Sequence, residues 1–265
     1  MTKRVGFGKI LNKVNKGRKF YRTMPLYKIA DIVFSANHIY KYTPELCKNY
    51  LYTGSLAPEF NAVITKEDIE SERARGGAEG FSDAYLESLA LFRKLCVYCL
   101  KERQGVIFHS SAVAVDGKAY LFTAPSGTGK STHVRLWREM LGDRAVMIND
   151  DKPIVRYTDG AFYVYGTPWN GKHRLDTNTR AKIAAICELR RGESNSITRI
   201  PPREMLMVIL NQTLRPEQAE DVDKYFALVD KMLKEVKLYR LYCNVSAEAA
   251  ALSYNAMSKG EGYEN

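Results

Sequence analysis

Residues that could bind a phosphate chain lie near the middle of the sequence, in Ser126-Gly-Thr-Gly-Lys-Ser-Thr132. An apolar run (Tyr120, Leu121, Phe122) precedes this segment. A helical pattern follows it, with apolar residues expected on one face at Val134, Trp137, Met140 and Leu141. In this strand–loop–helix order, Gly-x-x-x-x-Gly-Lys-[Ser/Thr] binds nucleotide phosphates, although Ala124 replaces the first glycine here. We therefore expect the segment to bind a nucleoside triphosphate.

Each residue type in this loop has a chemical reason to be there. Backbone N–H groups can point at phosphate oxygens, and the start of the following helix adds the positive end of its dipole. Lys130 can reach the β- and γ-phosphates, and the Ser131 hydroxyl can bind Mg²⁺. The expected cofactors are ATP and Mg²⁺. The expected nucleotide-binding residues are Ser126, Gly127, Thr128, Gly129, Lys130, Ser131 and Thr132.

Two carboxylates follow the next apolar run, in Val146-Met-Ile-Asn-Asp150-Asp151. Enzymes with a phosphate-binding loop use an aspartate at the end of a strand to hold Mg²⁺. With two adjacent acids, one can serve the metal while the other accepts a proton from an attacking hydroxyl. The alternative is an ordinary solvated turn, and the preceding apolar strand favours the catalytic interpretation.

Other polar residues carry weaker signals. His109 precedes a predicted hairpin and is a candidate only. Trp169, Asn170 and Lys172 could close over nucleotide or acceptor, or Trp169 could pack in the core, and both interpretations stay open. His133 and Arg135 are expected on the solvated face of the helix after the loop.

Hydrophobic periodicity and turn residues predict a mixed sheet flanked by helices. Asp116-Gly117 and Asp159-Gly160 each predict a β-hairpin, which argues against an all-parallel sheet. Expected strands lie at 26–35, 62–64, 182–189 and 238–243, with Thr65 capping a helix. Expected helices lie at 83–102, 203–212, from Pro216 to about 236, and from a Ser246 cap to about 257. The segments 75–80 and 192–202 are expected to be a linker and a loop.

Composition narrows the class of protein. The chain has 265 residues, a formal net charge of +10 and no apolar run long enough to span a membrane. Residues 1–22 form a basic tail with no acidic residue; we favour a solubilising end over contact with nucleic acid, anionic membrane or an acidic partner. Five scattered cysteines suggest reduced thiols and a cytoplasmic protein. Cys96 and Cys99 lack nearby ligand partners and are expected in the core.

The order of these motifs resembles the catalytic domain of the HPr kinase/phosphorylase family. The shared features are a histidine, a hairpin, the Ser-Gly-x-Gly-Lys-Ser loop and an aspartate pair. The whole chain is similar to HPr-kinase-related proteins of bacteria, which share the wording Asn-Asp-Asp-Lys-Pro and Gly-Thr-Pro-Trp-x-Gly-Lys. The resemblance implies that Asp150 is the base for the acceptor hydroxyl, with His109 against that carboxylate, and that Ser131 and Asp151 hold Mg²⁺. It also implies a homo-oligomer.

The sequence thus predicts an α/β, kinase-like domain at 105–257, an N-terminal α+β region at 23–104 and a tail at 258–265. The expected function is ATP- and Mg²⁺-dependent phosphoryl transfer to a hydroxyl acceptor. A serine of a peptide or small protein is a candidate acceptor. The expected catalytic residues are Asp150, His109 and Lys130. The main alternative is a nucleotide-binding regulatory module with little or no catalysis. A carboxykinase-like enzyme acting on a small acid would need further metal ligands and arginine anchors, which are not recognisable in this sequence. The body of the chain also shows no nucleic-acid-binding motif, which argues against nucleic acid as the partner.

Overall fold

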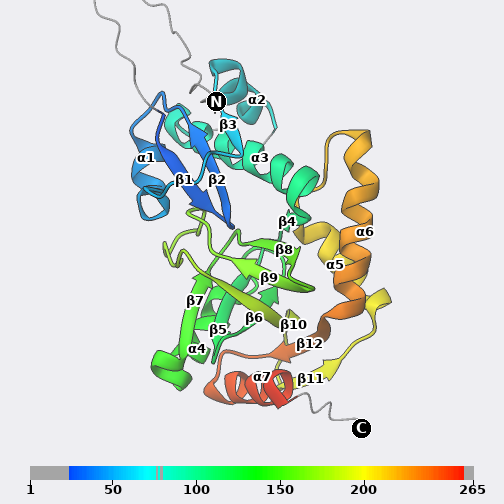
Figure 1. Ribbon diagram of the computed structural model, residues 1–265. Coiled ribbons are helices and arrows are strands. Elements are labelled where there is room, and N and C mark those ends of the chain that lie inside the picture. The colour runs from blue at the N-terminus through cyan, green and yellow to red at the C-terminus, as the bar shows by residue number, and fades with distance from the viewer. Residues whose placement is uncertain (1–23, 76, 78–79, 260–265) are drawn as a thin grey trace, which may run out of the picture.

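The computed structural model describes residues 24–75, 77 and 80–259. The predicted basic tail at 1–22, most of the predicted C-terminal tail and part of the predicted linker lie outside these residues. The described chain forms a mixed α/β structure with one small and one large sheet (Figure 1). None of its helices is both long enough and apolar enough to cross a membrane.

The N-terminal region carries the small sheet. Its elements are β1 (Leu26–Ile29), β2 (Ile32–Ala36), β3 (Phe60–Ala62), α1 (Tyr42–Leu46), the 3-10 turn η1 (Lys48–Tyr50), α2 (Lys66–Ala74) and α3 (Asp83–Arg103). The single strand predicted at 26–35 was wrong, because Ala30 and Asp31 take positive φ angles of 52° and 58° and turn the chain into an antiparallel hairpin. The Thr65 cap is confirmed: its hydroxyl accepts the N–H of Asp68, whose carboxylate accepts the N–H of Thr65.

The large sheet has nine strands. They are β4 (Gly105–Ile107), β5 (Ser111–Val115), β6 (Lys118–Thr123), β7 (Ala145–Asn149), β8 (Ile154–Thr158), β9 (Ala161–Tyr165), β10 (Arg180–Arg191), β11 (Ser196–Arg199) and β12 (Lys237–Cys243). The strand β10 pairs in parallel with β6 on one side and with β12 on the other, whereas β5 is antiparallel to both β6 and β7. The mixed sheet and both predicted hairpins, β5–β6 and β8–β9, are confirmed.

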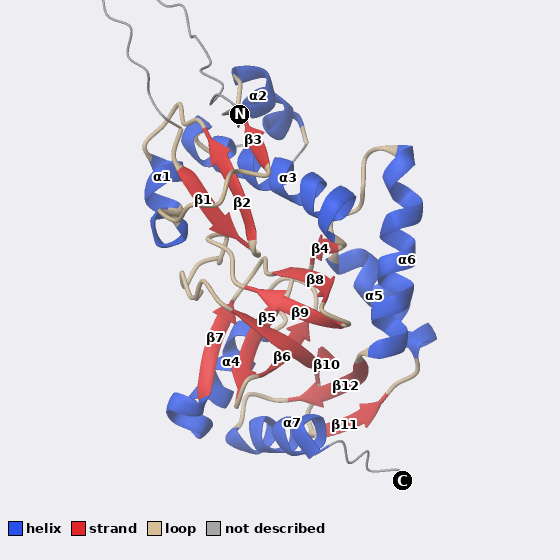
Figure 2. Cartoon of the chain, in the orientation of Figure 1, coloured by secondary structure: helices blue, strands red, loops and turns tan. Residues whose placement is uncertain are grey.

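Helices cover both faces of the large sheet (Figure 2). They are α4 (Lys130–Leu141), α5 (Pro202–Gln212), α6 (Ala219–Glu235) and α7 (Ala247–Lys259), with the 3-10 turn η2 (Gly142–Arg144) after α4. The helices α5 and α6 bury apolar residues against one face, and α4 and α7 against the other. Of the apolar face predicted for α4, Val134 and Trp137 are buried, but Met140 is 40% exposed.

Two predictions in the C-terminal part were wrong for tertiary reasons. The expected loop at 192–202 contains β11, which pairs antiparallel with β12 and buries Ile197. The helix predicted from Pro216 begins at Ala219. The segment before it is held outside the helix, because the backbone N–H of Leu214 donates to the carbonyl of Ile107 and the Glu217 carboxylate binds arginines from the N-terminal region.

The N-terminal region packs on the large sheet mainly through α3. This helix contacts β4 and α6 as well as α1 and α2. Its residues share a buried cluster with Tyr165 and Trp169 from the large sheet and the segment that follows it. Cys96 and Cys99 lie in that cluster, as predicted, and none of the five cysteines forms a disulfide.

Candidate active site

The candidate site lies where β6 and β7 end and β5 begins. Because β5 is antiparallel to both neighbours, its first residue lies beside their last ones: Ser111 is opposite Phe122, and Ala112 is opposite Asn149. Three segments therefore meet at one edge of the sheet. They are the loop after β6, the aspartate pair after β7 and His109 before β5.

The loop after β6 has the backbone that its glycines predict. Gly127 and Gly129 take φ angles of 79° and 124°, which residues other than glycine rarely adopt. The helix α4 begins directly at Lys130, so its unpaired N–H groups lie at the loop. Ala124 is buried and does not have a positive φ angle, so this position does not require the glycine of the usual pattern.

Lys130 lies inside the loop and close to the aspartates. Its ammonium donates to the carbonyl oxygens of Ala124, at 2.8 Å, and Pro125, at 3.3 Å. Burial lowers the pKa of Lys130, while the charges of Asp151 and Asp150 oppose that shift. The lysine is therefore positioned between the loop and the carboxylates, with its hydrogen bonds made to the loop's own backbone.

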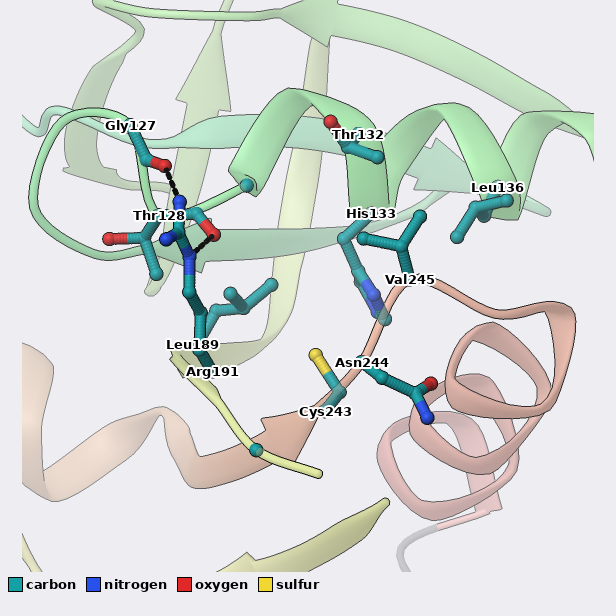
Figure 3. Close-up of a pocket in the computed structure, with 12 residues that line it drawn as sticks. Gly127, Thr128, Thr132, His133, Leu136, Leu189, Arg191, Cys243, Asn244 and Val245 are labelled. Carbon is teal, nitrogen blue, oxygen red and sulfur yellow. Dashed lines mark hydrogen bonds between the residues drawn. The ribbon is translucent and has the colours of Figure 1, made fainter. Parts of the chain in front are cut away.

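A pocket of about 380 Å³ adjoins the loop (Figure 3). It is formed at the carboxyl ends of β10 and β12, which run parallel to β6, and ends of parallel strands are where α/β sheets bind ligands. Its walls come from the loop, from α4 and from the two strand ends: Gly127, Thr128, Gly129, Thr132, His133, Leu136, Leu189, Arg191, Gly192, Cys243, Asn244 and Val245.

Arg191, which no sequence motif indicated, contacts the loop directly. Its guanidinium donates to the carbonyl of Gly127 at 2.6 Å and to that of Thr128 at 3.3 Å (Figure 3). The signal that could have found it is its place at the end of a strand next to β6, but pairing of β10 with β6 is not visible in the sequence. The arginine holds the tip of the loop against the wall of the pocket.

Asp150 is the first acid of the aspartate pair. Its carboxylate is buried and accepts a hydrogen bond from the Ser111 hydroxyl at 2.7 Å. Burial raises the pKa of Asp150, and the Ser111 and Ser131 hydroxyls act in the opposite direction. The structure thus places Asp150 near Ser131.

Asp151 lies against His109. The Nε2 atom of His109 is 3.2 Å from the Asp151 carboxylate, and the Lys152 ammonium is 2.5 Å from it. Burial would raise the pKa of Asp151, but the hydrogen bond with His109 and the charge of Lys152 outweigh it and lower the pKa to about 2. The expectation that His109 lies against the Asp150 carboxylate was therefore wrong, because the histidine contacts the second acid of the pair.

The other sequence candidates are placed as follows. Trp169 is core: its ring stacks on Phe92 at 4.2 Å and its indole N–H donates to the carbonyl of Ser88. Asn170 is buried and binds Asp176, whereas Lys172 is exposed.

His133 and Arg135 of α4 have different environments. His133, expected on a solvated face, is 3% exposed and bonded to the Ser253 hydroxyl at 2.9 Å, because α7 covers this side of α4. Burial lowers its pKa to about 4. Arg135 is exposed, as predicted, and pairs with Glu139.

The oxygen ligands at the site suit Mg²⁺ when nucleotide phosphates supply further ligands. No group of three or more acidic, histidine or cysteine side chains that could hold a metal exists among the described residues. Mg²⁺ keeps several waters and binds through one or two protein oxygens together with substrate phosphates. The Asp150 carboxylate and the Ser131 hydroxyl, placed at the start of α4, fit that requirement.

Comparisons with known proteins give little. No protein-family model matches the chain, and no curated protein matches it. Among solved structures, the chain is similar to the "Hpr(Ser) kinase/phosphatase from Coxiella burnetii", with 10% sequence identity and a TM-score of 0.33, over 59% of this chain and 99% of that one. Sequence identity and structural similarity this low do not assign a function, so the function is inferred from the geometry of the site.

Proposed function

We propose that the protein is an ATP- and Mg²⁺-dependent phosphotransferase that passes the γ-phosphoryl group to a hydroxyl. The observation that carries the proposal is the position of the aspartate pair. Asp150 lies near Ser131, and Asp151 contacts His109. Both contacts are at the edge of the sheet where α4 begins with Lys130. A fixed carboxylate pair beside a phosphate-binding loop can hold the Mg²⁺ that neutralises a transferring phosphoryl group and can position the attacking hydroxyl.

The pocket supports one orientation of the nucleotide. In the sheet, β6 lies between β10 and β12 on one side and β5 and β7 on the other, so the loop separates the pocket from the aspartates. A nucleoside in the pocket would reach the loop with its phosphates, because Gly127, Gly129 and Thr132 belong to both. Its γ-phosphate would then lie toward Lys130 and the carboxylates.

Ser131 and Asp150 are the residues that would hold Mg²⁺. When bound, the ion would supply neutralisation of the charge on the β- and γ-phosphates. Lys130 would exchange its two backbone carbonyls for phosphate oxygens, which are charged acceptors and make stronger hydrogen bonds. The loop amides would complete the binding of the phosphate chain.

Asp151 is the residue we assign to the acceptor, which exchanges the roles that the sequence suggested for the two acids. Its lowered pKa keeps it ionised near neutral pH, so it can accept a hydrogen bond from the incoming hydroxyl. The acceptor oxygen would bond to the γ-phosphorus, the bond from that phosphorus to the β–γ bridging oxygen would break, and the hydroxyl proton would pass to the Asp151 carboxylate. The products would be ADP and the phosphorylated acceptor. His109 would orient Asp151.

The test compares MgATP binding and ATP turnover in the wild type, Lys130→Ala and the control Lys118→Ala. Lys118 is exposed at the start of β6, at the far end of the strand that carries the loop. We expect Lys130→Ala to weaken MgATP binding by about tenfold or more and to abolish turnover, while the control behaves like the wild type. A Lys130→Ala variant that binds and turns over ATP normally would refute the proposal.

A nucleotide-binding regulatory module is the second candidate function. Lys130 is bonded to carbonyls of its own loop, and it could exchange these bonds for phosphate oxygens in such a module as well as in an enzyme. A nucleotide-binding regulatory module would bind MgATP through Lys130 and show neither hydrolysis nor transfer. The same assay therefore separates the two functions.

A further inference from the structure

The segment between β9 and β10 carries a basic tip on a fixed base. At the base, Trp169 is buried, and the Asp176 carboxylate accepts hydrogen bonds from Asn170 and from the Tyr50 hydroxyl. Thr177 donates its backbone N–H to the carbonyl of Ile148 at 3.1 Å and its hydroxyl to that of Met147 at 2.8 Å. The base is thus tied both to β7 and to the N-terminal region.

The tip consists of Gly171, Lys172, His173 and Arg174, and we call it the basic arm. All four residues are exposed, and within the described part of the chain none of the three basic side chains has a carboxylate within 4.0 Å. Gly171 and Arg174 take φ angles of 72° and 51°, so the backbone turns sharply at both ends of the arm.

The basic arm lies directly on the acceptor side of the aspartate pair. A Cβ atom on Gly171 would be 3.1 Å from the Cβ of Asp151, so the arm's backbone touches that residue. Arg174 lies near Tyr42, the first residue of α1.

The positive charge of the arm is not needed to balance the site. Asp151 already has Lys152 and His109 as partners. The phosphate chain would already meet Lys130 and the amides of the loop. Lys172 and Arg174 therefore remain as surplus charge at the place where an acceptor would approach.

Building on the proposed phosphotransferase function, we propose that the basic arm recognises the acceptor as an acidic peptide or protein segment. Carboxylates flanking the phosphorylated hydroxyl would pair with Lys172 and Arg174 while that hydroxyl reaches Asp151. An exposed arm that carries Lys172 and Arg174 suits an extended segment with several negative charges. Exposed ion pairs are individually weak and sensitive to salt, so the recognition depends on several pairs acting together.

The test is a peptide kinase assay with charge reversal. Three synthetic peptides carry one central serine flanked by glutamate, alanine or lysine residues. The assayed proteins are the full-length wild type, Lys172→Glu/Arg174→Glu and the control Lys118→Glu/Lys237→Glu. The control makes the same charge change at the exposed starts of β6 and β12, at the other end of the sheet.

We expect the wild type to have a KM for the glutamate peptide about tenfold below that for the alanine peptide, and the preference to shrink in 0.5 M NaCl. The arm variant should prefer the lysine peptide, and the control should keep the wild-type preference. Equal use of all peptides by the wild type would overturn the inference. So would loss of MgATP affinity in the arm variant alone, because the arm would then bind phosphate.

Two failures remain distinguishable. If the wild type binds MgATP but phosphorylates none of the peptides, the inference about an acidic peptide acceptor is wrong and the nucleotide function stands. If the wild type does not bind MgATP, the proposed function itself fails.

Discussion

The Nε2 atom of His109 lies 3.2 Å from Oδ1 of Asp151, across the start of β5 and the end of β7. The backbone on both sides is fixed: the N–H of His109 donates to the carbonyl of Gln212 at 2.7 Å, and the N–H of Ser110 donates to that of Asp151 at 3.2 Å. The Thr123 hydroxyl also donates to the carbonyl of His109. This pairing, together with that of Asp150 and Ser131, separates the two carboxylates into two local environments.

The two aspartates should therefore fail differently when each is changed to asparagine. Asp151→Asn removes the proton acceptor, so turnover should fall by roughly 10²–10⁴ while MgATP affinity stays near that of the wild type. Asp150→Asn should weaken MgATP binding by about tenfold and leave metal-free ATP binding unchanged. Calorimetric titration of each variant with ATP, with and without Mg²⁺, beside turnover, makes the comparison. The opposite pattern would restore Asp150 as the base.

His109→Ala tests whether the histidine acts through Asp151. Removing the imidazole should lower turnover by about tenfold and shift the acid-side loss of activity to higher pH, because the hydrogen bond that helps to lower the pKa of Asp151 is gone. The double variant His109→Ala/Asp151→Asn should be no slower than Asp151→Asn alone, since both changes remove one unit. A double variant whose loss of turnover equals the product of the two single losses would mean that His109 acts on its own.

The pocket next to the loop is tested by filling it. Leu136→Trp should weaken ATP binding by about tenfold or more but leave binding of inorganic tripolyphosphate unchanged, because only the nucleoside needs the pocket. Met140→Trp is the matched control, one turn further along α4 and 40% exposed. If Leu136→Trp binds ATP as tightly as the wild type does, the nucleoside lies elsewhere.

His133 predicts a dependence of stability on pH. Burial lowers its pKa from its ordinary value of 6.5 to about 4. Below pH 6.5 the unfolded chain takes up a proton that the folded chain does not, so the stabilisation is complete above that pH and decreases as the pH falls toward 4. Between pH 7 and pH 5 this loss is about 2 kcal/mol.

The measurement is urea unfolding at both pH values. His133→Gln keeps a group that can bond the Ser253 hydroxyl but cannot be protonated in this range. Its free energy of unfolding should fall by about 2 kcal/mol less than that of the wild type between pH 7 and pH 5. Identical pH dependence in the two proteins would show that His133 is not the responsible group.

The sequence by itself determined the features that depend on local interactions. The loop glycines predicted positive φ angles at Gly127 and Gly129, because only glycine adopts them without strain. The Asp-Gly pairs predicted two hairpins, and Thr65 with Asp68 predicted a helix cap, because each depends on residues close together in the chain.

Only the tertiary structure decided which of these local features meet. The contact of His109 with Asp151, the burial of His133 under α7 and the approach of Arg191 to the loop join residues far apart in sequence. Each follows from strand order and helix packing, which a single sequence does not specify. The exchange of roles that we propose for Asp150 and Asp151 depends on the same physical fact. Adjacent residues in a turn point in different directions, and only the folded sheet sets what each one faces.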